Sequence, residues 1–174
     1  MDIPEDVTFE DAIALTQSLM TQLSSDELSQ VEAGNAIAQL VKTTNGARGF
    51  FVTYLTADDS LADTPSPEVI QALQSSPDTV AELLVKNLAM SAAMAITHRR
   101  NQNEDMAQGS DRVRRRTIHL IEQINLPQVQ EKVVALRESA ITGEGSYKTF
   151  LERWQYDAQQ REIIFDILTA LQGQ

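Results

Sequence analysis

No cysteine occurs among the 174 residues of the chain. This absence excludes disulfides, thiolate catalysis and thiolate metal sites together. The chain also lacks an uncharged apolar run of the roughly 20 residues that span a bilayer. Its N-terminus, MDIPEDVTFED, is acidic where a secretory signal is basic. We therefore expect a cytoplasmic protein that does not bind a membrane.

Basic charge is scarce as well, since 14 Lys and Arg residues face 25 Asp and Glu residues and the net charge is −11. Such a surface repels phosphate backbones, which argues against a nucleic-acid partner unless the basic residues gather on one face. A hydrophobic content of 42% argues against disorder. We expect residues 1–174 to form one helical domain, with an acidic N-terminal tail over residues 1–7.

The stretch around which the chain is organised covers residues 77–100, and its positions 87–98 carry no formal charge. On a helical wheel its leucines and several alanines share one broad side. On the opposite side, the small residues Ala89 and Ala93 let a neighbouring backbone come close. The pattern predicts a central buried helix over 77–100.

Apolar residues at helical spacing and capping signals predict the other elements. The sequence indicates about seven helices, over residues 8–23, 24–43, 67–75, 77–100, 110–124, 129–141 and 147–172, with main loops at 57–66 and 101–109. Residues 50–56, FFVTYLT, favour a strand by local composition. We nevertheless predict a helix there, because a lone strand would find no partner elsewhere in the chain.

Six of the fourteen basic residues lie within residues 99–116, and we call them the arginine cluster: Arg99, Arg100, Arg112, Arg114, Arg115 and Arg116. With its three acidic residues, this segment has a net charge of +3, so the rest of the chain carries −14. On the helix over 110–124, Arg112, Arg115, Arg116 and His119 form a stripe on the polar face. A short antiparallel connection would place Arg99 and Arg100 at the same end. The candidate partner- or anion-binding residues are therefore Arg99, Arg100, Arg112, Arg115, Arg116 and His119.

Three interpretations of this cluster stay open. The arginines pair with the chain's own surplus carboxylates, they dock an acidic segment of another protein through guanidinium–carboxylate pairs, or they bind RNA or a phosphate-bearing ligand. The third is weakened because no aromatic residues alternate with the arginines, as stacking on single strands would need.

The two histidines do not predict a metal site. His98 and His119 differ by roughly 10 Å in axial level on the expected helices, so one ion would not bridge them. His119 and Glu122 form a single i, i+3 pair in the reverse order of a di-iron carboxylate motif. The glycine-bearing segments 46–49 and 143–146 lack the Gly-Lys-Ser/Thr ending of a P-loop. We identify no metal ligand, cofactor or catalytic residue.

The sequence thus predicts an all-α, single-domain bundle around the helix over 77–100. Its favoured role is a non-catalytic interaction or regulatory module that docks an acidic protein segment at the arginine cluster. The alternative is a bundle, enzymatic or not, that binds a small phosphate-bearing or other anionic ligand inside a cavity. The sequence does not decide between a monomer and a homo-oligomer.

Overall fold

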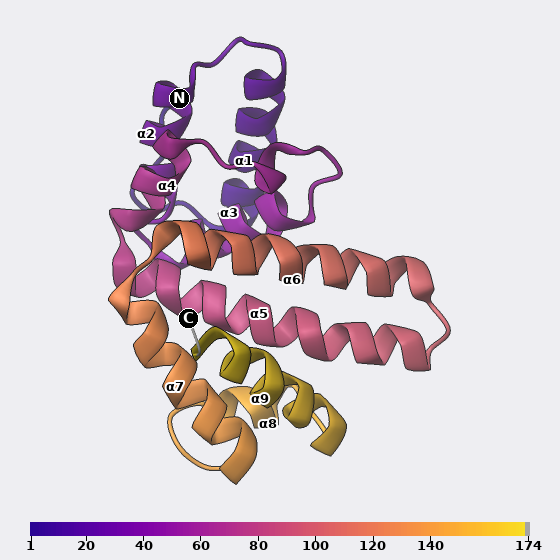
Figure 1. Ribbon diagram of the computed structural model, residues 1–174. Coiled ribbons are helices and arrows are strands. Elements are labelled where there is room, and N and C mark those ends of the chain that lie inside the picture. The colour runs from indigo at the N-terminus through magenta and orange to yellow at the C-terminus, as the bar shows by residue number, and fades with distance from the viewer. Residues whose placement is uncertain (173–174) are drawn as a thin grey trace.

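The computed structural model describes residues 1–172, which form α-helices, one 3-10 helix and no strand (Figure 1). The elements are α1 (Phe9–Ser24), α2 (Gln30–Leu40), α3 (Thr44–Thr56), η1 (Leu61–Asp63), α4 (Pro67–Gln74), α5 (Pro77–Arg100), α6 (Glu104–Ile124), α7 (Pro127–Thr142), α8 (Lys148–Arg153) and α9 (Ala158–Gln172). The predicted all-α class is confirmed, and so is the helix over 77–100.

The fold is built on a long antiparallel hairpin of α5 and α6. Helices α1 to α4 lie on one side of its base and α7 to α9 on the other, while the far end of the hairpin projects beyond them (Figure 1). Helix α5 packs against α3, α4, α6, α7 and α9. It is therefore the central helix that the sequence predicted.

Helix α5 is long and apolar enough to span a bilayer by composition, but 56% of its most apolar window is buried inside the protein. The neighbouring helices cover more than half of this apolar window. On α9, the Gln160 side chain donates a hydrogen bond to the Ala93 carbonyl at 3.0 Å, so α9 contacts α5 at the small-residue step through a side chain. The burial of α5 is that of a core helix.

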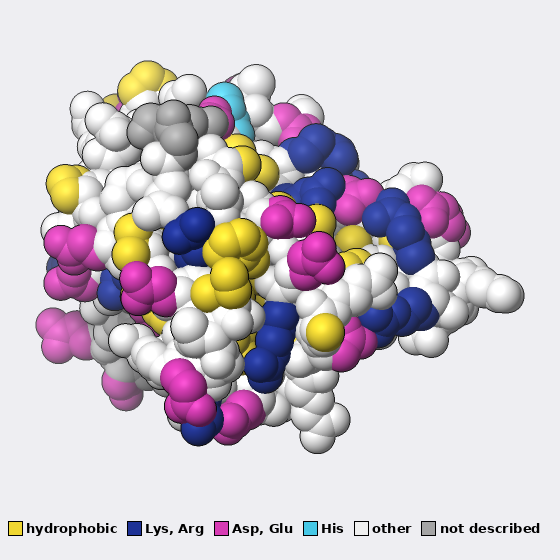
Figure 2. Space-filling model, turned by 60° about the horizontal axis from the view of Figure 1, so that its bottom comes forward, with side chains coloured by type: hydrophobic (Ala, Val, Ile, Leu, Met, Phe, Trp, Pro, Cys, Tyr) yellow, Lys and Arg dark blue, Asp and Glu magenta, His cyan; other side chains and the backbone are white. Residues whose placement is uncertain are grey.

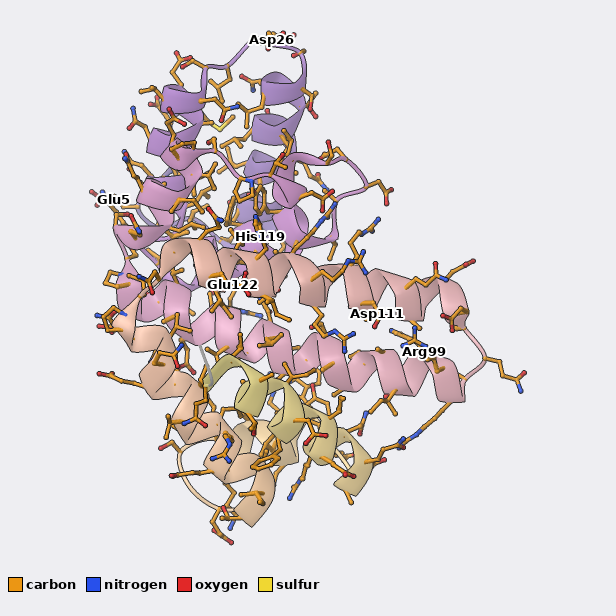
Figure 3. The ribbon with its side chains drawn as sticks, viewed as in Figure 1. Glu5, Asp26, Arg99, Asp111, His119 and Glu122 are labelled. Carbon is orange, nitrogen blue, oxygen red and sulfur yellow. The ribbon has the colours of Figure 1, made fainter. Side chains whose placement is uncertain are left out.

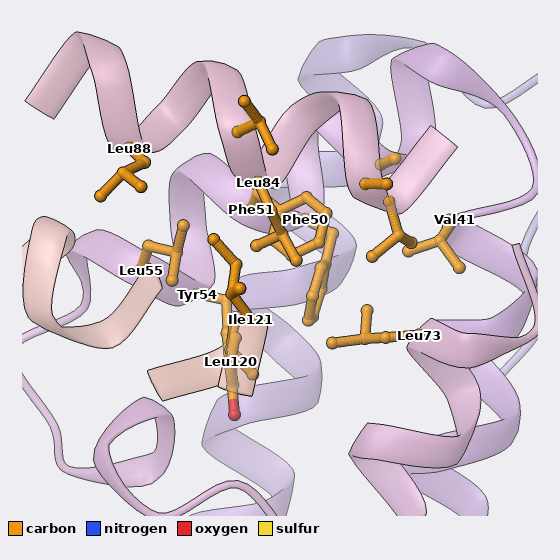
Figure 4. Packing of buried hydrophobic residues seen from close by; sticks show 14 of the residues in the cluster. Val41, Phe50, Phe51, Tyr54, Leu55, Leu73, Leu84, Leu88, Leu120 and Ile121 are labelled. Atoms are coloured by element: carbon orange, nitrogen blue, oxygen red, sulfur yellow. The ribbon is translucent and has the colours of Figure 1, made fainter. Parts of the chain in front are cut away.

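The β-prone residues of α3 fill the core between α5 and α6 (Figure 4). Phe50 and Phe51 are fully buried, and the Phe50 ring stacks on Tyr54 with 4.9 Å between centroids. They pack with Leu84 and Leu88 of α5 and with Leu120 and Ile121 of α6 in one cluster. The Thr43 hydroxyl caps the helix by accepting the Gly46 N–H at 3.1 Å. The helix predicted over residues 50–56 is confirmed, because three-dimensional burial outweighs the local strand preference.

Helix α2 begins later than the sequence predicted. Ser24 is instead the last residue of α1, and Glu27 lies in the turn that follows, where Asp26 has a φ of 58°. The working cap is Ser29, whose hydroxyl accepts the Glu32 N–H at 3.1 Å while the Glu32 carboxylate accepts the Ser29 N–H at 2.9 Å. Both pairs have the Ser-x-x-Glu spacing of a capping box, so spacing alone did not distinguish them.

The loop predicted over residues 101–109 is wrong beyond residue 103. Asn103 caps α6, and its side chain accepts a backbone N–H of the first turn at 3.3 Å. Helix α6 therefore starts at Glu104, and Gly109 lies inside it. Ala107 is fully buried and anchors this turn. The polar composition reflects the exposed end of the hairpin rather than a loop.

Two other boundaries also differ from the prediction. The helix expected over 147–172 is broken between α8 and α9, where Gln155 has a φ of 54° and Asp157 and Gln160 bond each other's backbone N–H groups. The expected loop 57–66 contains η1. The acidic tail over 1–7 is partly anchored, because Val7 is buried in the core.

Gly49 lies at a close crossing of α1 and α3. A Cβ at Gly49 would lie 2.4 Å from the Ala12 Cβ and 2.8 Å from the Phe9 carbonyl oxygen, so α1 and α3 cross where only glycine fits. Gly109, in α6, has no atom within 4 Å of the position of a Cβ.

This contrast gives a matched pair of substitutions. We expect Gly49→Ala to lower the free energy of unfolding by about 1 to 3 kcal/mol, because the added methyl overpacks the crossing. Gly109→Ala should raise it by up to about 1 kcal/mol, because alanine is the better helix former. Chemical denaturation of both variants measures the effect. A Gly109→Ala variant less stable than the wild type would contradict a helical start for α6.

Candidate functional site

Arg99 joins the two arms of the hairpin. Its Nη2 atom lies 2.7 Å from Asp111 and 3.1 Å from Glu104, both on α6 (Figure 3). The hydrogen bond from Arg99 holds the pKa of Asp111 below its ordinary value. Arg114 lies 3.8 Å from the same carboxylate. Two members of the arginine cluster are thus neutralised by residues of the hairpin itself.

Arg100 connects the hairpin to α9. Its guanidinium contacts the Asp157 carboxylate and donates to the Gln159 side-chain oxygen. The hydrogen bond to Asp157 raises the pKa of Arg100. Because both partners are largely exposed, this pair is exchangeable and contributes little to stability.

Arg116 is not on a solvent-facing stripe, contrary to the sequence prediction. Its side chain is only 3% exposed and enters the segment between α3 and η1. It donates to the carbonyls of Leu55 (3.0 Å), Ala57 (2.7 Å) and Asp59 (2.8 Å) and pairs with the Asp63 carboxylate at 2.8 Å. We call this arrangement the Arg116 cage. Arg116 is therefore a structural residue that a partner cannot reach.

The other residues of the stripe are distributed around this cage. Arg112 is half-buried and donates to the Thr56 carbonyl at 3.2 Å, with Asp58 at 3.4 Å. Arg115 is exposed, and within residues 1–172 no carboxylate lies within 4.0 Å of it. His119 is half-buried on α6, near the base of the hairpin (Figure 3). The structure thus brings Arg112 and Arg115 together at the surface and separates them from Arg116 and His119.

Most of the cluster's charge is matched by the protein's own acids. Figure 2 shows Lys and Arg side chains lying beside Asp and Glu side chains over the face it draws. The acidic residues of the 57–66 loop, above all Asp63, are the sequence signal that could have predicted internal pairing of these arginines. A helical wheel did not reveal it, because the wheel describes only one helix.

An apolar groove lies between the arms of the hairpin and beside Arg112. It has a volume of about 410 Å³, and its lining includes Met90, Met94, Met106 and Val113 together with the polar side chains of His98, Asp105 and Arg112. We call it the methionine groove. The Met106 residue is 53% exposed. Sequence reasoning missed the groove because it placed Met106 in a loop, where no surface facing α5 would form.

The described part of the chain holds no group of three or more His, Asp or Glu side chains that could bind a metal ion. His119 and Glu122 lie on the same helix (Figure 3), and among residues 1–172 no third His, Asp or Glu forms a metal-binding group with them.

We expect Arg116→Gln to lower the free energy of unfolding by about 2 to 4 kcal/mol, because it leaves buried carbonyls and a carboxylate without their donor. The neighbouring Arg115→Gln is the matched control and should stay within about 0.5 kcal/mol of the wild type. Thermal or chemical denaturation measures both. Equal stabilities would show that the cage does not hold the fold together.

The cage also predicts a pH dependence. The hydrogen bond from Arg116 holds the pKa of Asp63 below its ordinary value. Because the folded-state pKa is lower than the unfolded value of about 3.9, this contribution is present above that value and is lost as the pH falls through the folded pKa. Denaturation of Asp63→Asn at several pH values should show a stability deficit near neutral pH that closes in acid. In an Arg116→Gln background, Asp63→Asn should no longer change the pH profile.

The comparisons with known proteins bear on the whole fold. No curated protein and no solved structure gives a significant match to the chain. Residues 8–171 match the model of the family described as Uncharacterised conserved protein UCP020893. The matched region begins at the cap of α1 and ends within α9, so it includes the hairpin and the methionine groove. Because the match extends over almost the entire helical fold, the chain belongs to this family.

Proposed function

We propose that this protein is a non-catalytic interaction module of the cytoplasm. Its methionine groove binds the apolar face of an amphipathic helix from a partner protein, and acidic residues on that helix meet Arg112 and Arg115. The observation that carries this proposal is the open apolar groove at the hairpin, which is lined in part by Arg112 and adjoins a second hollow that holds the exposed Arg115.

The size and lining of the groove suit a helix. Met90 and His98 are eight residues apart on α5, which corresponds to about 12 Å and roughly two turns of a docked helix. Methionine side chains are unbranched and polarizable, so they adapt to the shape of an apolar partner. A helix in such a groove contributes anchors at i, i+3, i+4 and i+7.

The charge beside the groove indicates the kind of helix. Arg112 makes only a long 3.4 Å contact to Asp58, whose side chain is 99% exposed. A partner carboxylate can replace Asp58 at little cost, because exposed ion pairs contribute about 0 to 1 kcal/mol. Arg115 is exposed and can pair without losing any carboxylate of the described chain. Acidic residues on the partner would therefore be attracted without disturbing the Arg116 cage.

The interior supports surface docking over an internal ligand site. The space between α3, α5 and α6 is filled by large buried side chains (Figure 4). The methionine groove, in contrast, is open toward solvent and includes the exposed Met106. A filled core with a functional surface is what distinguishes an interaction module from a bundle that encloses a small ligand.

A selection of displayed random peptides against the intact protein tests the proposal. We expect the enriched peptides to have apolar residues at helical spacing and Asp or Glu on the flanks. Their affinity should fall by about tenfold or more on Met106→Glu, which places a charge in the groove. Binding should also weaken with salt, since exposed charges are screened over about 8 Å at physiological ionic strength.

The matched control is Val31→Glu, because Val31 is an exposed apolar residue on α2, far from the hairpin in sequence. This variant should bind the selected peptides like the wild type. Enrichment of basic peptides, or equal binding to Met106→Glu and to the wild type, would contradict the proposal.

A further inference from the structure

A second candidate binding site lies at the other end of α5, between α5, α7 and α8. It is an open pocket of about 510 Å³, and its lining includes Glu82, Lys86, Lys132, Tyr147, Phe150 and Arg153. We call it the lysine pocket. It shares no lining residue with the methionine groove, so it is independent of the interaction proposed there.

The carboxylate of Glu82 organises this pocket. It accepts a hydrogen bond from the Tyr147 hydroxyl at 2.7 Å and pairs with Lys86 at 3.1 Å and Lys132 at 3.2 Å. Burial raises the pKa of Glu82, but the hydrogen bonds from Tyr147, Lys86 and Lys132 outweigh it and the pKa lies below its ordinary value. An ionised Glu82 thus holds ammonium groups from two different helices at one place.

The carboxylate of Glu82 leaves some N–H donors of Lys86 and Lys132 without a partner on Glu82. Each ammonium has three N–H donors, and the pairing with Glu82 takes one from each. Lys86 also lies over the Phe150 ring, 5.5 Å from its centroid. The side chains of Lys86 and Lys132 are 34% and 26% exposed, so their remaining donors can reach a ligand.

The charge of the pocket differs from that of the rest of the protein. Its lining holds three cations, Lys86, Lys132 and Arg153, against the carboxylates of Glu82 and Glu131. The pocket is therefore net positive on a chain whose net charge is −11. Partly buried charges are screened less by salt than fully exposed ones, so an anion gains more here than on the open surface.

We propose that the lysine pocket binds the phosphate group of a small, soluble phosphate monoester. The two lysines contact the phosphate oxygens as point charges, and the exposed Arg153 supplies a guanidinium that can bond two oxygens at once. The rings of Tyr147 and Phe150, with centroids 6.3 Å apart, offer an apolar wall to the organic part of the ligand.

Titration with inorganic phosphate and with phenyl phosphate, followed by amide NMR at constant ionic strength, tests this site. We expect saturable shifts confined to α5, α7 and α8, with phenyl phosphate binding more tightly than phosphate. Lys132→Gln should weaken binding by about tenfold or more, because it removes a charged hydrogen-bond donor. The matched control is Lys42→Gln, an exposed lysine just after α2, which should bind like the wild type.

Because Lys132 also pairs with Glu82, a second variant separates binding from folding. The side chain of Arg153 lines the pocket without pairing with Glu82, and Arg153→Gln should weaken binding while leaving the thermal midpoint unchanged. Absence of saturable shifts, or equal affinity in both pocket variants and the wild type, overturns the proposal. Binding to phosphatidylcholine vesicles only when they contain phosphatidic acid, without binding of either soluble phosphate, also overturns it.

Discussion

At the C-terminal end of helix α3, two arginines of α6 donate hydrogen bonds to the last carbonyls. The final C=O groups of a helix have no partner within it and carry partial negative charge. Arg116 bonds the Leu55 and Ala57 carbonyls and Arg112 bonds that of Thr56, so α6 provides a charged cap for α3. This contact fixes the N-terminal helices on the hairpin and orders the segment leading to η1. The Tyr54 hydroxyl adds a bond to the Leu61 carbonyl within the same segment.

Pairing within the chain explains why so little of the arginine cluster faces solvent as free charge. A chain with 25 acidic residues offers a carboxylate or carbonyl to most of its arginines. Those deep in the fold, such as Arg116, are fixed by several bonds at once, whereas Arg100 has an exposed partner that solvent can replace. Exposure therefore divides the arginine cluster into a buried, structural part and a solvent-exposed part. Arg115 belongs to the exposed part, whereas Arg112 is intermediate, because it bonds the Thr56 carbonyl and also reaches the exposed carboxylate of Asp58.

The sequence predicted those elements that depend on local signals. The bounds of α5 were correct because a proline fits the first turn at Pro77 and because its uncharged centre needs burial. The helix over 50–56 was also correct, through the argument that a single strand would find no partner. The loop predicted over 101–109 was wrong because a polar segment can form either a helix or a loop without leaving its backbone groups unsatisfied, since water can bond them. An exposed helix end and a loop have the same composition, and only the cap at Asn103 distinguishes them.

The candidate sites were harder to predict, for a different physical reason. Each depends on side chains from elements that are distant in the sequence. Arg116 is buried by a segment more than fifty residues earlier, and Lys132 meets Lys86 through Glu82. A wheel places a residue on a face but does not show which other helix covers that face. Packing by another segment determines what each arginine does here. Arg116 is buried by the segment between α3 and η1 and bonds it, whereas the neighbouring Arg115 is exposed to solvent.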